Sequence, residues 1–338
     1  MSSSILRAHS PSPPGDGDRP RILVLLATHN GQEFLDEQLN SVLSQADVDV
    51  TVLVSDDAST DQTIPMLAQR AETDSRVALL EPGQFGSAAK NFARLIRDAD
   101  ITGFDAVALC DQDDIWRPGK LRRHFDILSA PRGLDGLGSY SAVSSNVTAF
   151  APDGTRQLIV KNQTQQLADY AFESGGPGST FLIRPEAFRL VQQQLRNPQS
   201  SANTARSHDW LIYALIRANG GRWFIDGEPT VEYRQHEDNV LGANEGWRQH
   251  LRRLAVIREG TYRADVANVV VAALEVADAK HSARLHWIAT QIETNSLRSR
   301  LRLARRARHL RRRRRDQLVL AATTVSYTHL TLPTKRIV

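Results

Sequence analysis

Three groups of carboxylates stand out in this chain of 338 residues. They are Asp56-Asp57, the run Asp111-Gln112-Asp113-Asp114, and Asp209, which follows His208. Paired aspartates are common in turns, but three carboxylates within four residues repel one another and are costly unless a cation lies among them. Oxygen ligands alone suit Mg²⁺ or Mn²⁺ better than zinc. The run therefore predicts a divalent-metal site, and a solvated acidic turn remains the alternative.

The elements that would position these groups follow from the apolar pattern. Short apolar runs predict strands at residues 22–27, 50–54, 77–80 and 106–110, and the amphipathic stretches between them predict helices. Strands and helices that alternate in this way indicate an α/β fold with a parallel sheet and right-handed crossovers. Ligands bind such sheets at the carboxyl ends of the strands, where the first two acidic groups fall.

The second half of the chain is less regular. It predicts strands at 143–150, 179–184, 222–226 and 230–233, a helix at 209–219, and a largely helical chain from 246 onward. Residues 325–334 read like a translated sequencing adapter, so 325–338 are expected to be a non-native tail, with a short native tail as the alternative. The expected organisation is a flexible tail at 1–20, a main domain at 21–244 and a helical extension at 245–320.

Charge is unevenly distributed along the chain. The formal net charge is +4, but residues 296–315 hold eleven arginines and no Lys, Asp or Glu, which leaves −7 for the remainder. An acidic main body argues against a nucleic-acid surface over the whole protein. The single cysteine, Cys110, excludes a disulfide scaffold and suits a reducing compartment. Because the chain shows neither a signal-peptide pattern nor a membrane-length apolar run, a cytoplasmic location is expected.

Several motifs, taken in order, resemble those of family 2 glycosyltransferases. They are Ala-Thr-His-Asn at 27–30, Ser-Asp-Asp-Ala-Ser-Thr-Asp at 55–61, Asp-Gln-Asp-Asp-Ile-Trp at 111–116 and Tyr-Arg-Gln-His at 233–236. The resemblance covers residues 21–244 and is greatest to bacterial rhamnosyltransferases of surface-polysaccharide assembly. It implies the GT-A fold, in which a Rossmann-like, mostly parallel central sheet is flanked by helices. It also implies an inverting, metal-dependent transfer of a sugar, rhamnose by analogy, from a dTDP or UDP donor to a saccharide or lipid-linked saccharide.

The resemblance assigns five residues to the nucleotide-sugar donor: Ala27, His29, Asp57, Lys90 and Asp111. Ala27 and His29 lie on the first loop, where they would meet the base and ribose; the family more often has an aromatic residue at the second of these positions. Asp57 would accept a hydrogen bond from the imide N–H of uracil or thymine. Lys90 would reach the diphosphate, with an exposed lysine at the start of a helix as the alternative.

Metal and catalytic roles are implied in the same way. Asp111 and Asp113 would form the Asp-x-Asp motif. Asp113 would contact Mg²⁺ or Mn²⁺, and Asp111 would contact the ribose or the metal. His236 would complete the metal shell or meet the diphosphate, unless it is structural. Asp209 matches the catalytic base, although its usual neighbour is Glu and here is His208. The glycine-rich segment 175–180 would lie beside the acceptor.

The arginine block at 296–315 leaves three interpretations open. An amphipathic basic helix would lie on an anionic membrane, at the inner face of the cell membrane, whereas a solvated tail or a nucleic-acid contact would use the same charges. The alternative function is therefore a non-catalytic nucleic-acid or membrane-surface binding protein, which would leave the acidic groups unexplained. A sugar-nucleotide pyrophosphorylase is disfavoured because residues 28–33 contain no Lys or Arg.

Overall fold

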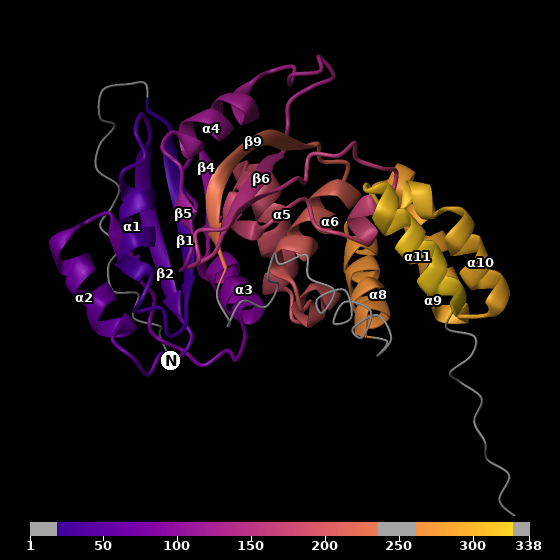
Figure 1. The fold of residues 1–338 in the computed structure, drawn as a ribbon, viewed down its shortest axis with the longest axis horizontal. Helices are drawn as coiled ribbons and strands as arrows, with labels where there is room; N and C mark the ends of the chain where they lie inside the picture. The colour runs from indigo at the N-terminus through magenta and orange to yellow at the C-terminus, as the bar shows by residue number, and fades with distance from the viewer. Residues whose placement is uncertain (1–18, 236–260, 327–338) are drawn as a thin grey trace, which may run out of the picture.

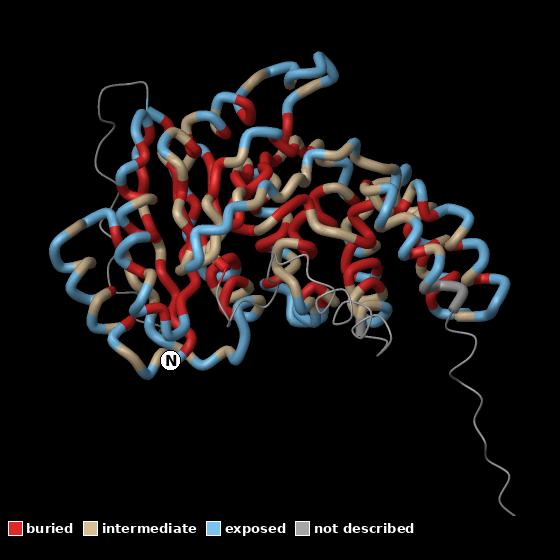
Figure 2. The backbone as a smooth tube through the Cα atoms, viewed as in Figure 1, coloured by how far each residue is buried: buried red, intermediate tan, exposed pale blue. Residues whose placement is uncertain are grey.

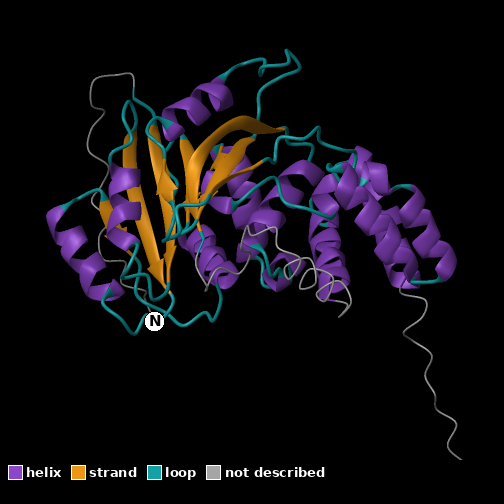
Figure 3. Cartoon of the chain, in the orientation of Figure 1, coloured by secondary structure: helices purple, strands orange, loops and turns teal. Residues whose placement is uncertain are grey.

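The computed structural model describes residues 19–235 and 261–326, which form a nine-stranded mixed sheet flanked by helices (Figure 1, Figure 3). The strand order is β3-β2-β1-β4-β8-β6-β9-β5, with β7 paired to β6. The first four strands in this order are parallel: β1 (Arg21–Thr28), β2 (Asp49–Asp56), β3 (Val77–Leu79) and β4 (Ala106–Cys110). The strands predicted for the first half of the chain are confirmed, with ends that differ by no more than two residues.

The register of these strands brings their carboxyl ends together. Thr28 lies opposite Asp56 across β1 and β2, and Leu26 lies opposite Cys110 across β1 and β4. The residues that follow the three strands therefore share one edge of the sheet, as the parallel topology requires. This edge carries the first loop and the first two acidic groups.

Five further strands complete the sheet. They are β5 (Ile115–Trp116), β6 (Ala142–Phe150), β7 (Arg156–Ile159), β8 (Leu182–Ile183) and β9 (Trp223–Arg234). The two strands predicted at 222–226 and 230–233 are one strand, because β9 pairs with β6 on both sides of an irregularity between Ser145 and Val147. The strand predicted at 179–184 is wrong in its first half, because a 3₁₀ turn, η2 (Gly178–Thr180), precedes the short β8.

Helices cover both faces of the sheet, and the alternation of side chains along β1 assigns each face its core. Ile22, Val24 and Leu26 pack on the side of α1 (Leu35–Leu43), α2 (Thr63–Thr73) and α4 (Lys120–Ser129). The residues between them face α3 (Ala88–Asp98), α5 (Pro185–Arg196) and α6 (His208–Ala218). The helices predicted between the first strands and at 209–219 are thus confirmed, whereas α4 and α5 were not predicted. Figure 2 shows the sheet as the most deeply buried layer.

The C-terminal helices extend from the α6 side of the sheet (Figure 1). They are α8 (Thr261–Leu274), α9 (Ala279–Thr294), α10 (Leu297–Arg305) and α11 (Arg314–Ser326), with the short η4 (Ala307–His309) between the last two. The single amphipathic helix predicted at 296–315 is therefore wrong. The backbone breaks where the His309 carbonyl accepts a hydrogen bond from the Ala168 N–H. The expected domain boundary at 244–245 lies outside the described residues. In the described ranges no helix is long and apolar enough to cross a membrane.

Candidate active site

The first loop and the second strand meet at the carboxyl edge of the sheet. His29 follows β1, and its Nδ1 lies 2.6 Å from the carbonyl oxygen of Asp57. Because a carbonyl can only accept, Nδ1 carries the proton, and Nε2 is left to accept from the Asn30 amide at 3.2 Å. Ala27 is a buried residue of β1 two positions earlier. The structure thus places these three expected donor residues at one corner of the sheet.

The Asp57 carboxylate is held by a turn that precedes α3. Its Oδ1 accepts hydrogen bonds from the backbone N–H groups of Phe85 and Gly86, the latter at 3.0 Å. No residue in the described part of the chain hydrogen-bonds to Oδ2. A buried carboxylate with one oxygen fixed in this way presents the other to a ligand, and an imide N–H is a suitable donor for it.

Gln112 joins the acidic loop after β4 to the first loop. Its Oε1 accepts from the His29 N–H at 2.8 Å, and its Nε2 donates to the His29 carbonyl at 2.9 Å. A Cβ on Gly31 would lie 2.3 Å from that Oε1, so only glycine leaves room for the Gln112 side chain. Sequence reasoning passed over both residues, because neither a lone glutamine nor a lone glycine signals a link between loops.

Replacing Gly31 tests this link. We expect Gly31→Ala to push the Gln112 side chain away from His29 and to weaken nucleotide binding about tenfold, the size of one or two lost hydrogen bonds, with the fold retained. Calorimetric titration with UDP and dTDP measures the change. In a Gln112→Ala background Gly31→Ala should add less than about twofold; a full additive loss would show that the two residues act independently.

Carboxylates from two distant parts of the chain come together beside this loop. Burial, reinforced by the nearby carboxylates of Asp113 and Asp209, raises the pKa of Asp111 to about 8. The Tyr233 phenol of β9 lies near the same carboxylates. Burial raises the pKa of this phenol, and the charges of Asp114, Asp111, Asp113 and Asp209 raise it further. The fold therefore brings the predicted Asp-x-Asp motif and the predicted base into electrostatic reach of one another.

Arg234, at the end of β9, holds the acidic loop from behind. Its Nε donates to the Asp113 carbonyl at 2.8 Å, and its backbone N–H donates to Asp114 Oδ1 at 3.2 Å. The guanidinium also pairs with Glu37 and lies 4.5 Å from the centre of the Phe34 ring. These contacts fix the backbone on which Asp113 stands. The motif at 233–236 indicated this segment, but it did not predict that Arg234 holds the acidic loop.

Asp209 lies in the first turn of α6. Its Oδ1 accepts from the Trp210 N–H at 2.7 Å and from the hydroxyl of Ser207, the N-cap residue. A carboxylate in this position interacts favourably with the positive end of the helix dipole. Among the described residues none hydrogen-bonds to Oδ2. The arrangement fixes one carboxylate oxygen and leaves the other to meet a hydroxyl.

The residues around Asp209 pack against the protein's own rings. The His208 ring stacks on Phe92 with centroids 3.9 Å apart, and burial lowers the pKa of His208 although Asp209 opposes the shift. A Cβ on Gly178 would lie 2.6 Å from His208 Nε2, and one on Gly175 would lie 2.8 Å from the Tyr213 ring. The glycines at these two positions thus make room for internal rings, and a Cβ on Gly178 would also lie 3.6 Å from the Cβ of Asp209, so a place beside the acceptor stays a prediction.

The expected metal site is only partly within the described residues. No group of three His, Cys, Asp or Glu side chains suited to a metal ion occurs in residues 19–235 and 261–326. His236 lies outside these ranges. Lys90 is exposed in the first turn of α3 and lines a small cavity with His208. Its amine makes no hydrogen bond or ion pair with the described residues, so its role at the diphosphate stays a prediction.

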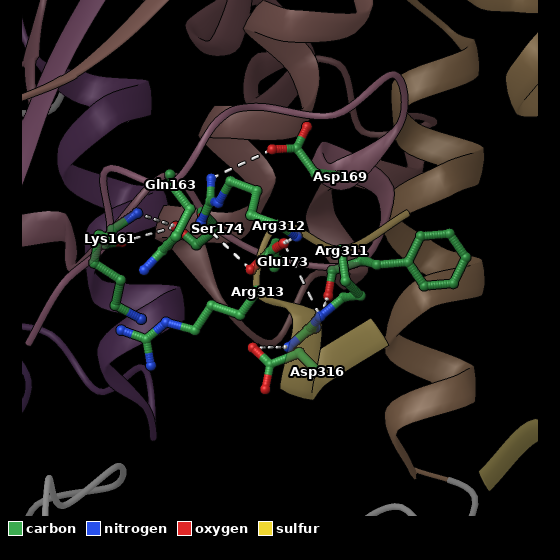
Figure 4. Close-up of polar contacts among 12 residues, drawn as sticks. Lys161, Gln163, Asp169, Glu173, Ser174, Arg311, Arg312, Arg313 and Asp316 are labelled. Carbon is green, nitrogen blue, oxygen red and sulfur yellow. Dashed lines mark hydrogen bonds and ion pairs between the residues drawn. The ribbon is translucent and has the colours of Figure 1, made fainter. Parts of the chain in front are cut away.

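The end of the arginine block packs against Glu173 and Ser174, just before the glycine-rich segment (Figure 4). The Arg312 side chain is 1% exposed and pairs with Asp169 and Glu173, each at 3.4 Å. Burial, followed by the charges of Arg312 and Arg313, lowers the pKa of Lys161 to about 8, while Glu173 and Asp209 oppose the shift. Neither a solvated tail nor a surface helix describes these arginines. Their partners lie far away in the sequence, so the composition of the block gave no signal of them.

Comparison with known proteins agrees with this geometry. The sequence profile of glycosyl transferase family 2 matches residues 23–191, half of the chain. The dTDP-rhamnosyl transferase RfbG of Shigella flexneri is 36% identical over 246 residues, which cover 72% of this chain and 83% of RfbG. The chain belongs to glycosyl transferase family 2. Its membership confirms the predicted glycosyltransferase activity and disfavours a non-catalytic binding protein.

Solved structures confirm the fold of this family 2 transferase. S. aureus TarS 1–349 in complex with UDP-GlcNAc superposes with a TM-score of 0.51 at 14% identity, covering 90% of both chains. The same protein in complex with UDP gives a TM-score of 0.52 at 13% identity over the same shares. The transferase therefore has the GT-A fold that the sequence motifs implied.

Proposed function

We propose that this transferase moves a sugar from a dTDP or UDP donor to a hydroxyl group of a saccharide, with inversion, in the synthesis of a cell-surface polysaccharide. The proposal rests on the convergence of Asp111, Asp113 and Asp209 beside the first loop. The likeness to RfbG favours rhamnose and dTDP, and the TarS complexes favour a uridine nucleotide. Both bases offer the imide N–H that Asp57 would accept.

The donor would lie along the carboxyl edge of the sheet. His29 and Asp57 would receive the base, because the loop between them is fixed by the Gln112 pair and by the Phe85–Gly86 turn. Asp111 would face the ribose or the metal, and Lys90 would neutralise part of the diphosphate. Asp57, His29 and Asp111 follow β2, β1 and β4, which are neighbours in the sheet, so the donor would cross the strand ends in that order.

The acidic loop fits a hard divalent cation. Asp111 and Asp113, with His236 as a third ligand, would hold Mg²⁺ or Mn²⁺. Burial and then the repulsion of neighbouring carboxylates raise the pKa of Asp111, and a bound cation would oppose both effects. Such an ion, when bound, supplies Lewis-acid stabilisation of the leaving diphosphate. The chain's own contribution is the rigid loop, which Arg234 and Gln112 fasten from two sides.

Asp209 would act on the acceptor. Its Oδ1 is fixed by Trp210 and Ser207, so Oδ2 would accept the proton of the attacking hydroxyl as the new glycosidic bond forms. A single displacement of this kind inverts the anomeric centre. His208 keeps the helix start in place by packing on Phe92 rather than by proton transfer.

A donor screen on the full chain tests the proposal. We expect one pyrimidine nucleotide sugar, in the presence of Mn²⁺, to stabilise the protein by about 2.7 kcal/mol at a hundred times its Kd. Thermal unfolding across a panel of dTDP- and UDP-sugars measures the shift. Asp113→Ala should abolish it, whereas Asp153→Ala, an exposed turn aspartate, should keep it. A folded protein that responds to no donor would contradict the proposal.

We further propose that the transferase associates with the inner face of the cell membrane through α10. This helix exposes Leu297 and Leu301, at 52% and 36%, among the exposed arginines 298, 302 and 305. Leucines one turn apart can enter the lipid interface while each arginine nearby contributes about 1 kcal/mol on an anionic surface. A lipid-linked saccharide acceptor would be met at that surface.

Vesicle binding distinguishes this location from a freely soluble enzyme. Phosphatidylglycerol vesicles should bind the protein at least tenfold more tightly than phosphatidylcholine vesicles at low salt. The double variant Leu297→Ser/Leu301→Ser should lose most of this binding. Leu137→Ser, which alters a leucine that is 79% exposed on a distant loop, should not change it. Equal affinity for neutral vesicles would exclude the membrane role.

A further inference from the structure

Two cations near Asp209 have no role in the function described so far. Lys161 follows β7, and Arg313 lies at the start of α11. The Arg313 guanidinium donates to the Val160 carbonyl, which holds it beside the backbone of Lys161. In Figure 4 the ends of the two side chains lie next to one another. The contact brings together segments that are 153 residues apart in the sequence.

Neighbouring residues fix this pair in place. Arg311 donates to the Phe172 carbonyl at 2.6 Å and pairs with Asp316 at 3.4 Å, and Arg312 is buried between Asp169 and Glu173. These two arginines are therefore committed to structure. Arg313 differs from them, because it pairs with no carboxylate in the described part of the chain, and neither does Lys161. Two half-buried positive side chains thus lie beside one another.

The location of the pair identifies which substrate it can touch. The carboxylates that act on Lys161 most strongly are Glu173 and Asp209, and the charges that crowd it most are Arg312 and Arg313. Glu173 is occupied with Arg312. Arg312, the neighbour of Arg313, also donates to the Ser174 carbonyl, and a Cβ on Gly178, four residues further on, would lie 3.6 Å from the Cβ of Asp209. The pair therefore lies on the Asp209 side of the site, which the proposed function gives to the acceptor.

We infer that Lys161 and Arg313 form a binding site for a phosphate group of the acceptor. An ammonium and a guanidinium side by side match the oxygens of a phosphate, which takes charge-assisted hydrogen bonds from both. The Arg313 carbonyl accepts the first helical hydrogen bond of α11 from the Gln317 N–H, so the positive end of this helix lies at the same point. The inference rests on the proposed function, since it takes Asp209 as the base that meets the acceptor.

Inorganic phosphate is the first probe. With UDP and Mn²⁺ present in excess to fill the donor site, calorimetric titration should find one phosphate site on the full chain. Lys161→Gln and Arg313→Gln should each weaken it about tenfold, and Arg314→Gln, which changes the adjacent exposed arginine, should alter it less than twofold. Circular dichroism checks that each variant keeps its fold. Unchanged phosphate affinity in both variants, or an equal loss in Arg314→Gln, would overturn the inference.

Two further ligands identify the source of the phosphate. Farnesyl phosphate in neutral micelles should bind at least tenfold more tightly than inorganic phosphate if the acceptor is lipid-linked, and equally if the phosphate belongs to a soluble saccharide. Glucuronate should bind at least tenfold more weakly than phosphate; equal binding would make the pair a carboxylate site and overturn the assignment. Failure of UDP itself to bind would count against the proposed function. The effect of Lys161→Gln and Arg313→Gln on phosphate affinity would still decide the inference about this pair.

Discussion

Asp209→Asn should lower kcat by about 10²- to 10⁴-fold while nucleotide binding stays within about twofold of the native value. The substitution keeps the Oδ1 acceptor for Trp210 and Ser207, so the start of α6 retains its geometry. It removes only the ability to take a proton from the acceptor hydroxyl. Rates of donor hydrolysis and of sugar transfer, measured with the same donor, separate binding from catalysis.

A matched substitution distinguishes the base from any carboxylate near the site. Asp153→Asn makes the same chemical change at an exposed turn between β6 and β7 and should leave kcat unchanged. Asp209→Asn with residual transfer above a tenth of the native rate would contradict the assignment. So would a variant whose defect lies in donor affinity alone.

The second large effect concerns stability. Arg312→Met should destabilise the protein by about 3–5 kcal/mol, because it removes the buried guanidinium that lies 3.4 Å from both Asp169 and Glu173. Burial alone would lower the pKa of Arg312, but Tyr213, Glu173 and Asp169 together raise it, so this arginine stays charged in its pocket. Equilibrium unfolding in urea, followed by circular dichroism, measures the loss.

The neighbouring arginine again provides the control. Arg314→Met removes an exposed charge two positions away and should change the free energy of unfolding by less than about 0.5 kcal/mol. Equal effects of the two substitutions would show that Arg312 is not a structural residue. In the double variant Arg312→Met/Glu173→Met the loss should be smaller than the sum of the two single losses, since the Arg312–Glu173 contact is lost only once.

The positions of the candidate donor residues in the fold could be predicted because their determinants are local. The strand at β1 is an unbroken apolar run, and the acids after β2 and β4 follow directly from parallel topology. Asp209 could be placed from its motif and from the helix that it begins. In each case the residues that decide the structure lie within a few positions of the residue of interest.

The remainder depends on contacts between distant segments. Arg234 reaches Asp113 across 121 positions, and Arg312 reaches Asp169 across 143. A run of arginines looks the same whether its members are solvated or buried, because burial depends on carboxylates elsewhere in the fold. The glycines at 175 and 178 illustrate the same limit. These positions need glycine because the rings of Tyr213 and His208 lie against them, and no local sequence pattern predicts those contacts.

The pairing of Arg312 with Asp169 also affects the order in which the chain can fold during its synthesis. Chains grow at roughly 5–20 residues per second, so the 143 residues between these partners take roughly 7–30 seconds to synthesise. Until then the pocket of Asp169 and Glu173 lacks this guanidinium, and among the described side chains Asp169 has Tyr213 and, at 3.8 Å, Arg217 as its partners. We expect the nucleotide-binding half to fold first and the acceptor side to close last. During its synthesis the transferase would thus be able to bind the donor before its acceptor side is complete.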